Sequence, residues 1–389
     1  MDTTLFGLGS TGRLVPVSGI SGVHHAFVPN PLPPEWAWPA EMWPSLVRAR
    51  ESLARLDGVA RHLPKPHVLL PPLLGREAQK SSTIEGTYVE PEQLALFQID
   101  PYAPRSQDDP ANDRLEVLNY YRALRYAEEA RKTLPLSLRL IRDLHRILFG
   151  GVANAQGEPG EFRQLENAVG RPPRYVPPPP NLLPECLDVF EKYLHAPRKF
   201  DPLVDAFLVH YQFEAIHPFR DGNGRVGRLL LALTITEWCN LSGQWLLMSP
   251  YFDRNRDEYM RRLFDISTRG DWTGWIGFCL RGVHEQAEDA EARCERLLAI
   301  ERSFRDKIFS SGGSSRLPGI IEELIVLPVI TVAQASKRWK VAYPTARGDL
   351  EKLVLAGVLS EIAGVKPKAF YAPEIIRATY GELKPDEPK

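Results

Sequence analysis

Apolar residues return every three or four positions along most of this chain, which is the period of an amphipathic α-helix. In residues 136–149, for example, Leu138, Ile141, Leu144 and Leu148 share one helical face. With this pattern or a helix-compatible apolar run, the stretches expected to be helical are 41–62, 75–86, 113–132, 136–149, 183–195, 202–216, 228–240, 251–268 and 272–300. The pattern therefore predicts a mostly α-helical protein.

Segments that lack the helical period divide the chain. Residues 1–30 are rich in Gly, Ser and Thr, and we expect a flexible arm there. Residues 64–74 carry closely spaced prolines and predict an extended link, because proline disfavours the helical conformation of the residue before it. A polar link is expected at 98–112, and the Ser/Gly run at 311–316 predicts a flexible linker before a separate C-terminal domain.

The C-terminal residues 317–389 have a pattern of their own. The expected elements are helices at 319–327 and 344–356, a helix that Thr331 caps, and two strands at 358–362 and 369–371 that pair as a wing. This order resembles a winged helix-turn-helix domain. The basic residues on the expected binding surface are Lys337, Arg338, Lys340, Arg347, Lys366 and Lys368. Because winged helices also dock proteins and form dimers, the pattern leaves DNA binding open.

Composition and charge narrow the class of protein. The chain has 389 residues, 43% of them hydrophobic and 25% charged, which is typical of a globular protein with two or three domains. A formal net charge of −1 gives no overall attraction to nucleic acid or to a membrane. The four cysteines are far apart, which favours buried free thiols over a disulfide or zinc site. Without a signal segment or a membrane-length apolar run, we expect a cytoplasmic protein.

Candidate chemistry concentrates in residues 210–231, HYQFEAIHPFRDGNGRVGRLLL. An apolar helix leads to His217, a Gly-rich loop follows, and a second helix begins near Arg225. Backbone N–H groups at the start of that helix can bind an anion, and glycine lets the backbone approach it closely. Arg225 and Arg228, three residues apart, project from one face and can grip phosphate oxygens. Asp221 can bind Mg²⁺, so these residues together predict a phosphate-transfer site with His217 as general base.

Each of these features taken alone is usually an ordinary turn or a solvated arginine. Their combination within twelve residues outweighs that interpretation, because a turn has no use for a base, an acid and two arginines. The stretch is not a Walker A loop, because no Gly-Lys-Ser/Thr follows.

Residues 217–228 (HPFRDGNGRVGR) resemble, at every defining position, the HxFx(D/E)GNGRxxR motif of Fic-domain proteins. The resemblance implies transfer of AMP from ATP to a hydroxyl of a target protein. It makes His217 the catalytic base and Asp221 the Mg²⁺ ligand. The residues it implies for ATP binding are Asp221, Gly222, Asn223, Gly224, Arg225, Val226, Gly227 and Arg228, with the 222–225 backbone and Asn223 around the α- and β-phosphates and Arg228 on the γ-phosphate.

Residues 75–86 are a second informative stretch. Ser81 and Glu85 lie four apart and share one face of a helix that Gly86 would end. A glutamate at such a position is usually solvated. The segment Ser81-Ser82-Thr83-Ile84-Glu85-Gly86 also resembles the (S/T)xxxE(G/N) inhibitory helix of Fic proteins, which implies that Glu85 pairs with Arg228. Such a pair would occupy the arginine that should hold the γ-phosphate.

Two further site elements rest on the resemblance. Residues 150–184 are Gly/Pro-rich with strand-like pieces at 162–165 and 167–169, and would form the family's β-hairpin flap, which holds the target by strand addition. Val169 and Gly170 would lie near the nucleotide. The adenine pocket would lie around Tyr259, for which a core position is an equal alternative.

The resemblance implies a Fic-type helical core with a β-hairpin flap, a helical N-terminal region and a C-terminal winged helix-turn-helix (α+β). The expected division is a flexible arm at 1–30, an N-terminal region with the inhibitory helix at 31–112, the Fic core at 113–310, a linker at 311–316 and the winged helix at 317–389.

The expected function is that of a protein adenylyltransferase (ATP and protein to AMP-protein and diphosphate) that uses ATP and Mg²⁺ on a Ser, Thr or Tyr hydroxyl and is inhibited in cis by Glu85. Three alternatives stay open: another donor on the same scaffold, removal of AMP, and a DNA-binding regulator whose Fic site senses ATP. The target, self-modification, a homodimer and DNA binding are not decided by the sequence.

Overall fold

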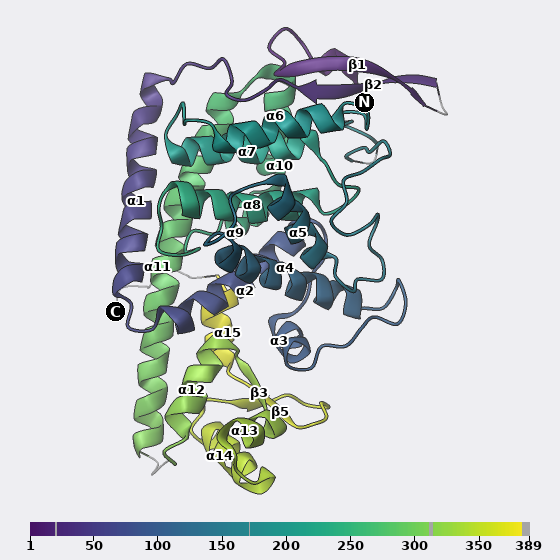
Figure 1. Ribbon diagram of the computed structural model, residues 1–389. Coiled ribbons are helices and arrows are strands. Elements are labelled where there is room, and N and C mark those ends of the chain that lie inside the picture. Colours follow the sequence, from purple (N-terminus) through teal and green to yellow (C-terminus); the bar gives the residue numbers. More distant parts are fainter. Residues whose placement is uncertain (20–21, 171, 311–313, 383–389) are drawn as a thin grey trace.

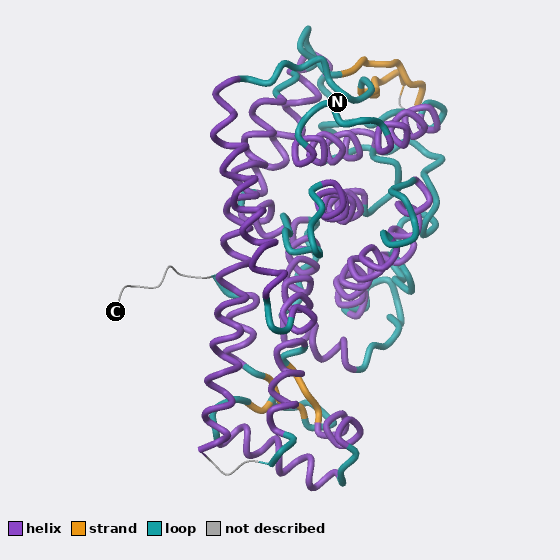
Figure 2. Tube along the Cα trace, turned by 60° about the vertical axis from the view of Figure 1, so that its left-hand side comes forward, coloured by secondary structure: helices purple, strands orange, loops and turns teal. Residues whose placement is uncertain are grey.

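The computed structural model describes residues 1–19, 22–170, 172–310 and 314–382. Helices dominate the described residues, and the strands lie at the two ends of the molecule (Figures 1 and 2). The long helix α11 (Trp272–Ser310) runs along one edge, with α1 (Trp43–His62) packed beside it. The prediction of a mostly α-helical fold is confirmed.

The N-terminal residues are more ordered than the sequence indicated. After a short 3-10 helix, η1 (Thr3–Leu5), strands β1 (Gly12–Gly19) and β2 (Gly22–Pro29) form an antiparallel hairpin. The expectation of a flexible arm is therefore wrong for the hairpin. Tertiary contacts explain the difference: the Phe27 N–H donates to the Val176 carbonyl at 2.8 Å, and the Phe27 ring packs on Tyr175.

Helix α2 (Pro66–Ile84) corrects a second expectation, because residues 64–74 were expected to be extended. Pro71 and Pro72 lie inside the helix and are buried with it against α4, α9 and α12. Burial of the apolar face (Val68, Leu69, Leu73, Leu74 and Ala78) outweighs the hydrogen bonds that the prolines remove. One continuous helix therefore reaches Ile84, where Glu85 and Gly86 end it as predicted.

Five predicted helices surround the candidate site. They are α4 (Ala111–Ala130), α5 (Leu138–Leu148), α6 (Leu183–His195), α7 (Pro202–Ile216) and α8 (Asn223–Trp238). Helix α7 is apolar on nearly every side, as expected of a helix in the centre of a domain, and it packs against α8. Ahead of α1 lies the short 3-10 helix η2 (Ala40–Met42), and between α2 and α4 lies α3 (Pro91–Ile99), which packs on α4.

The loop between α5 and α6, residues 149–182, is called the flap loop below. The predicted hairpin is reduced to one antiparallel bridge, in which Val169 pairs with Tyr175. The described residues of this loop contain no extended strand, because its many prolines cannot donate ladder hydrogen bonds.

The predicted helix at 251–268 is broken into α9 (Ser249–Arg254) and α10 (Arg256–Arg269) at Asn255. Helix α11 extends ten residues beyond the range expected from its pattern, to Ser310. Within the predicted linker, residues 311–313 lie outside the described residues.

The C-terminal unit combines short helices with a three-stranded antiparallel sheet in the order β3-β5-β4. Its elements are α12 (Leu317–Val326), β3 (Val329–Thr331), α13 (Val332–Trp339), α14 (Tyr343–Leu355), β4 (Ser360–Glu361), β5 (Ala369–Tyr371) and α15 (Pro373–Tyr380). Thr331 caps α13 and forms a capping box with Gln334, which confirms the predicted N-cap. Residues 383–389 of the expected winged helix lie outside the described residues.

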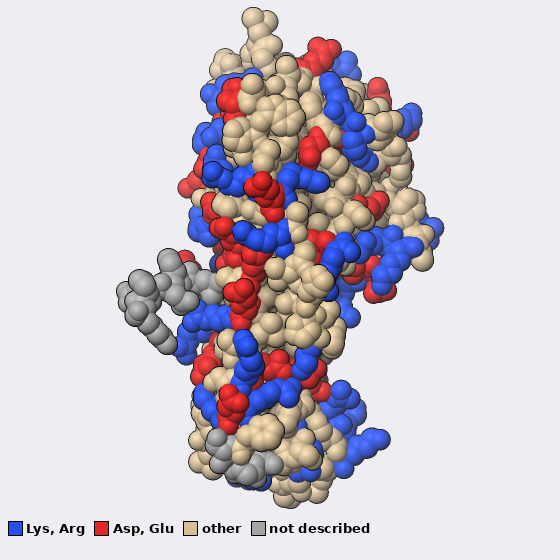
Figure 3. All heavy atoms as spheres, turned by 90° about the vertical axis from the view of Figure 1, so that its left-hand side faces the viewer, with Lys and Arg blue, Asp and Glu red and all other residues tan. Residues whose placement is uncertain are grey.

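The C-terminal unit packs directly on α2. Lys65, which precedes α2, forms ion pairs with Glu301 of α11 at 3.0 Å and Glu322 of α12 at 2.8 Å. Figure 3 shows acidic and basic side chains interspersed over the face formed by α1 and α11. None of the described helices is both long and apolar enough to cross a bilayer.

Candidate functional site

His217 lies at the end of α7, where the chain leaves the helix in a left-handed conformation (φ 51°, ψ 62°). Its Nδ1 is 3.3 Å from the Glu214 carbonyl oxygen. Since a carbonyl only accepts hydrogen bonds, Nδ1 carries the proton and Nε2 keeps its lone pair. Burial lowers the pKa of His217 to about 4, so the imidazole is neutral at pH 7 and can accept a proton.

The loop after His217 is locked by Asn223. Its Oδ1 accepts from the Phe219 N–H at 2.8 Å, and its Nδ2 donates to the Phe219 carbonyl at 2.9 Å. Both polar groups thereby hydrogen-bond within the loop, and the expected contact of Asn223 with phosphate stays a prediction. Gly222 has φ 72°, and a Cβ there would lie 2.4 Å from the Phe149 ring, which explains the need for glycine.

The first turn of α8 begins at Asn223 and carries backbone N–H groups that have no acceptor within the helix. The Glu85 carboxylate lies over this turn: a Cβ on Gly224 would be 2.3 Å from Glu85 Oε1. A negative charge is favoured at a helix N-terminus. The helix start at which we expect an anion to bind is therefore present, and the Glu85 carboxylate lies over it.

Arg228 projects from the second turn of α8 and is 2% exposed. Its Nη2 donates to Glu85 Oε1 at 2.7 Å and to the Ser81 carbonyl at 2.9 Å, and its Nε donates to Ser81 Oγ at 2.8 Å. The structure therefore brings Ser81, Glu85 and Arg228 together as the sequence predicted. Burial opposes the charge of Glu85, but Arg228 outweighs it, and the pKa of Glu85 is lowered.

Arg225 does not share this surface. It is 4% exposed and forms an ion pair with Glu116 of α4, with Asp221 Oδ1 4.0 Å away. Its guanidinium also lies over the Phe149 ring, 5.0 Å from the centroid. Arg225 and Arg228 therefore approach the start of α8 from different sides, each held by its own acidic partner.

Asp221 fits the expected role of a metal ligand. Its side chain is 40% exposed, and its Oδ1 accepts from the Gly222 N–H at 2.6 Å. The described residues contain no cluster of three or more metal-ligating side chains. A single carboxylate suits Mg²⁺, which usually takes the rest of its ligands from water and substrate phosphates.

A second carboxylate, Glu214, faces Arg228 from α7, and burial raises its pKa to about 8. Its Oε1 has no hydrogen-bond partner within the described residues. At pH 7 Glu214 is therefore largely protonated and adds little negative charge to the anion site. Gly227 makes room for it, because a Cβ there would be 2.4 Å from Glu214 Oε1.

The three remaining predicted site residues are Val226, Val169 and Gly170. The Val226 side chain is fully buried in the core, so its place in the motif concerns packing. Val169 and Gly170 lie in the turn of the flap loop that the Val169–Tyr175 bridge closes. Asn167 attaches this turn to the loop after His217, because its Nδ2 donates to the carbonyls of Phe219 and Arg220 at 3.3 and 3.1 Å.

The expectation that Tyr259 stacks on adenine is wrong. Tyr259 is 1% exposed, its ring packs on Phe252 at 4.4 Å, and its hydroxyl meets His210 Nε2 at 2.9 Å. The Tyr259 ring is packed within the hydrophobic core on all sides, which is the alternative that the sequence left open.

Sequence reasoning missed Glu116 and Arg163, which contact the catalytic segment from distant parts of the chain. Glu116 lies between the buried residues Leu115 and Val117, and a charge amid buried helical positions was the signal available. Arg163 lies in an irregular loop and gave no such signal. His145 packs on Phe219 at 3.9 Å and lies 3.2 Å from the Asp221 carbonyl, in agreement with a packing role.

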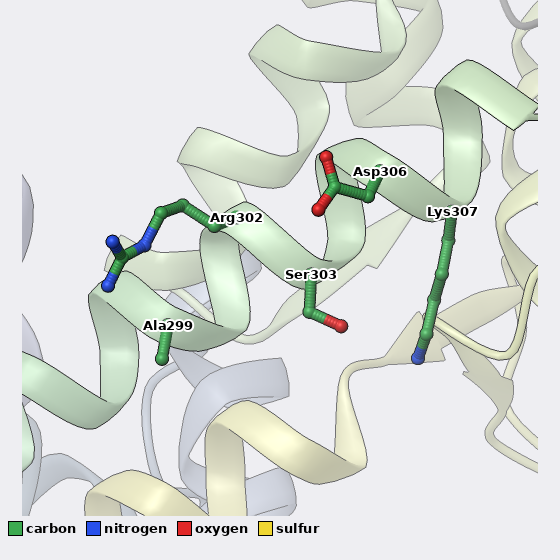
Figure 4. Close-up of a pocket in the computed structure, with 5 residues that line it drawn as sticks. All are labelled: Ala299, Arg302, Ser303, Asp306 and Lys307. Carbon is green, nitrogen blue, oxygen red and sulfur yellow. The ribbon is translucent and has the colours of Figure 1, made fainter.

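Two surface hollows lie away from the anion site. One, of 540 Å³, lies on the outer side of α11, and Figure 4 shows that all its residues come from that helix: Ala299, Arg302, Ser303, Asp306 and Lys307. The other, of 650 Å³, lies between α5, α6 and the stem of the flap loop, and Arg163 lines it. His217, Arg225 and Arg228 line neither hollow.

Two regions of the chain match models of known protein families. Residues 43–129 match the Fic/DOC family N-terminal domain, and residues 135–235 match the Fic/DOC family domain. The first match contains Ser81, Glu85 and Glu116, and the second contains His217 and the loop after it. The ion pairs of Arg225 and Arg228 therefore join the two matched regions.

The relatives and solved structures to which this chain is similar are also Fic proteins. The chain is 37% identical to protein adenylyltransferase Fic of Aedes aegypti over 120 residues, which are 30% of this chain and 23% of that protein. The match thus spans less than a quarter of the length of this relative. A Fic family protein from Desulfovibrio desulfuricans G20 has a similar fold (TM-score 0.56, 19% identity, covering 88% of this chain and 98% of that one). Fic-1 from C. elegans is similar over 63% of this chain and 71% of its own (TM-score 0.51, 20% identity).

Proposed function

The chain belongs to the Fic/DOC family, and we propose that it is a protein adenylyltransferase that moves AMP from ATP to a Ser, Thr or Tyr hydroxyl of a target protein. The observation that carries the proposal is the anion surface at the start of α8, with the buried Arg228 on one side and a neutral His217 beside it. A carboxylate already occupies this surface, which supports its affinity for anions.

In the proposed reaction, His217 Nε2 takes the proton of the target hydroxyl, and the hydroxyl oxygen attacks the α-phosphorus of ATP. The bond between the α-phosphorus and the bridging oxygen breaks, and diphosphate leaves. The N–H groups of the first turn of α8 and the Arg228 guanidinium stabilise the phosphate charge. Mg²⁺ held by Asp221 and the phosphates would neutralise charge on the leaving diphosphate.

We further propose that Glu85 inhibits the reaction in cis. It lies over Gly224 and holds Arg228, so phosphates can reach both only after the carboxylate has moved. Self-modification would follow from release of Glu85 without a target. The proposed domain division is that given by the sequence, with the N-terminal hairpin in place of a flexible arm.

The test is incubation of wild type, Glu85→Gly and His217→Ala with α-³²P-ATP and Mg²⁺, with and without cell lysate. Label on Glu85→Gly or on lysate proteins that His217→Ala abolishes is the expected result. Absence of label in every lane would overturn AMP transfer. Mass shifts after incubation with other nucleotide donors, and loss of AMP from a modified protein, would then decide between the remaining reactions on this scaffold.

The C-terminal unit supports a second proposal, a winged helix that binds a partner. Of its six predicted phosphate-binding residues, Arg338, Arg347 and Lys368 pair with glutamates of the same unit. These pairs reduce the charge available to DNA and favour a protein partner. A DNA shift assay with the full chain at low and high salt separates the two, since only DNA binding weakens steeply with salt.

A further inference from the structure

Arg163 is a buried cation in the stem of the flap loop. It is 6% exposed, and within the described residues it has no carboxylate partner. Its guanidinium donates instead to backbone carbonyls, with Nε 2.8 Å from His217 O, Nη1 3.3 Å from Leu165 O, and Nη2 2.5 Å from Pro178 O and 3.4 Å from Ile216 O. Burying a charge without an opposite charge is unfavourable. An arginine whose partners are all carbonyls therefore contributes through the fixed directions of its N–H donors, which hold those carbonyls in place.

These hydrogen bonds join three segments that are distant in sequence. Leu165 belongs to the outgoing arm of the flap loop and Pro178 to the returning arm, while Ile216 and His217 end α7. The backbone N–H of Arg163 adds a bond to the Pro218 carbonyl at 2.9 Å. The arginine thus fixes the carbonyls of residues 216–218 relative to both arms of the flap loop.

The backbone of His217 needs such support. Its left-handed conformation (φ 51°) is unfavourable for a residue that carries a Cβ. The His217 N–H still bonds to Phe213 O at 2.9 Å, but its carbonyl leaves the helix and is met by Arg163 Nε. The direction of the imidazole follows from this backbone conformation.

We propose that Arg163 is a positioning residue, which fixes the orientation of the His217 imidazole and couples it to the two arms of the flap loop. The inference rests on the proposed function, in which His217 is the base. Target segments that order the flap loop would thereby also steady the base. Arg163 itself touches neither substrate nor reacting atoms.

The charge of Arg163 gives a readout that a purely structural role would not move. Burial is the main cause of the low pKa of His217, and the positive charge of Arg163 lowers it further. Two groups raise the pKa of His217 and so oppose this lowering: the Glu214 carbonyl of α7 and the Glu85 carboxylate at the end of α2. Loss of the Arg163 charge should therefore raise the pKa of His217.

The experiment compares Arg163→Met and Arg163→Lys in the Glu85→Gly background, where the inhibitory carboxylate is absent. Arg142→Met is the matched control, because Arg142 also donates to a carbonyl of the flap loop (Gly160, 2.7 Å) but is 37% exposed and does not contact His217. We measure kcat and KM for ATP, and the pKa of His217 by NMR titration of histidine-labelled protein, assigned with His217→Ala.

For Arg163→Met we expect kcat to fall about 10- to 100-fold, since small misplacements of a catalytic group have this effect. KM for ATP should change little, and the pKa of His217 should rise. Arg163→Lys keeps the positive charge but loses the planar set of N–H donors. We therefore expect kcat to fall while the pKa of His217 stays near that of the parent. Arg142→Met should alter neither.

A folded Arg163→Met protein with parental kcat and parental pKa of His217 would overturn the proposal. If Arg163→Met does not fold, Arg163→Lys with parental kcat has the same meaning. The titration needs no activity, so it tests the placement of Arg163 even if the Glu85→Gly protein transfers no AMP, a result that would count against the proposed function alone.

Discussion

Removal of the Glu85 carboxylate tests the proposed inhibition most directly. In Glu85→Gly, Arg228 keeps its bonds to Ser81 Oγ and the Ser81 carbonyl, so its side chain stays in place. What disappears is the carboxylate over Gly224 and its charge-assisted bond to Arg228. Phosphates then gain access to both groups without competition.

The size of the effect follows from the contact. A hydrogen bond to a charged group contributes about 1.5–3 kcal/mol, and solvent screening moves a partly exposed pair toward the lower end. Glu85 is 38% exposed and Arg228 only 2%, so we take about 1.5–2 kcal/mol. The fraction of molecules ready to bind ATP should then rise about 10- to 30-fold, and kcat/KM with it.

The assay is the initial rate of ³²P transfer at ATP concentrations below KM. Glu85→Gln should lie between wild type and Glu85→Gly, because its amide still accepts from Arg228 but carries no charge. Glu129→Gln is the control, since Glu129 forms an exposed pair with Lys132 at 2.8 Å on the surface of α4. Equal kcat/KM for folded wild type and Glu85→Gly would refute the reasoning.

Two further predictions concern His217 and Arg225. In Glu85→Gly, kcat/KM should fall on the acid side at about pH 4 or below, because burial holds the pKa of His217 at about 4 with Glu85 present and loss of that carboxylate lowers the pKa further; an acid limb near pH 6.5 would contradict this. Glu116→Gln should lower the free energy of unfolding by about 3 kcal/mol in urea, because it leaves the buried Arg225 without its ion-pair partner. Adding Arg225→Met should recover most of that loss, and a Glu116→Gln protein as stable as wild type would show that the pair does not stabilise the fold.

The helices could be predicted where apolar residues recur at helical spacing, as in α4 and α5, or form a long apolar run, as in α7. Prediction was wrong where tertiary burial overrides a local preference. The prolines of α2 argue locally for an extended chain, yet the helix persists because its neighbours bury it on several sides. The N-terminal hairpin depends in the same way on its contact with the flap loop at Phe27.

In the candidate site, too, some residues could be predicted from the local sequence and others could not. His217, Asp221 and Arg228 are close in sequence, and a loop between two helices is enough to bring them together, so the motif by itself was enough to predict the proposed anion site and the proposed base. Asn223 belongs to the same motif, but only the structure showed that both its polar groups close the loop.

Glu85, Glu116 and Arg163 come from three other segments. The motif resemblance predicted the pairing of Glu85, whereas Glu116 and Arg163 became recognisable only when packing placed them against Arg225 and His217. The sequence by itself determined which chemical groups the catalytic segment carries, because those groups are consecutive. The tertiary structure decided what holds each of them in place, because the partners of a buried charge are chosen by packing between helices and loops that are distant in the chain.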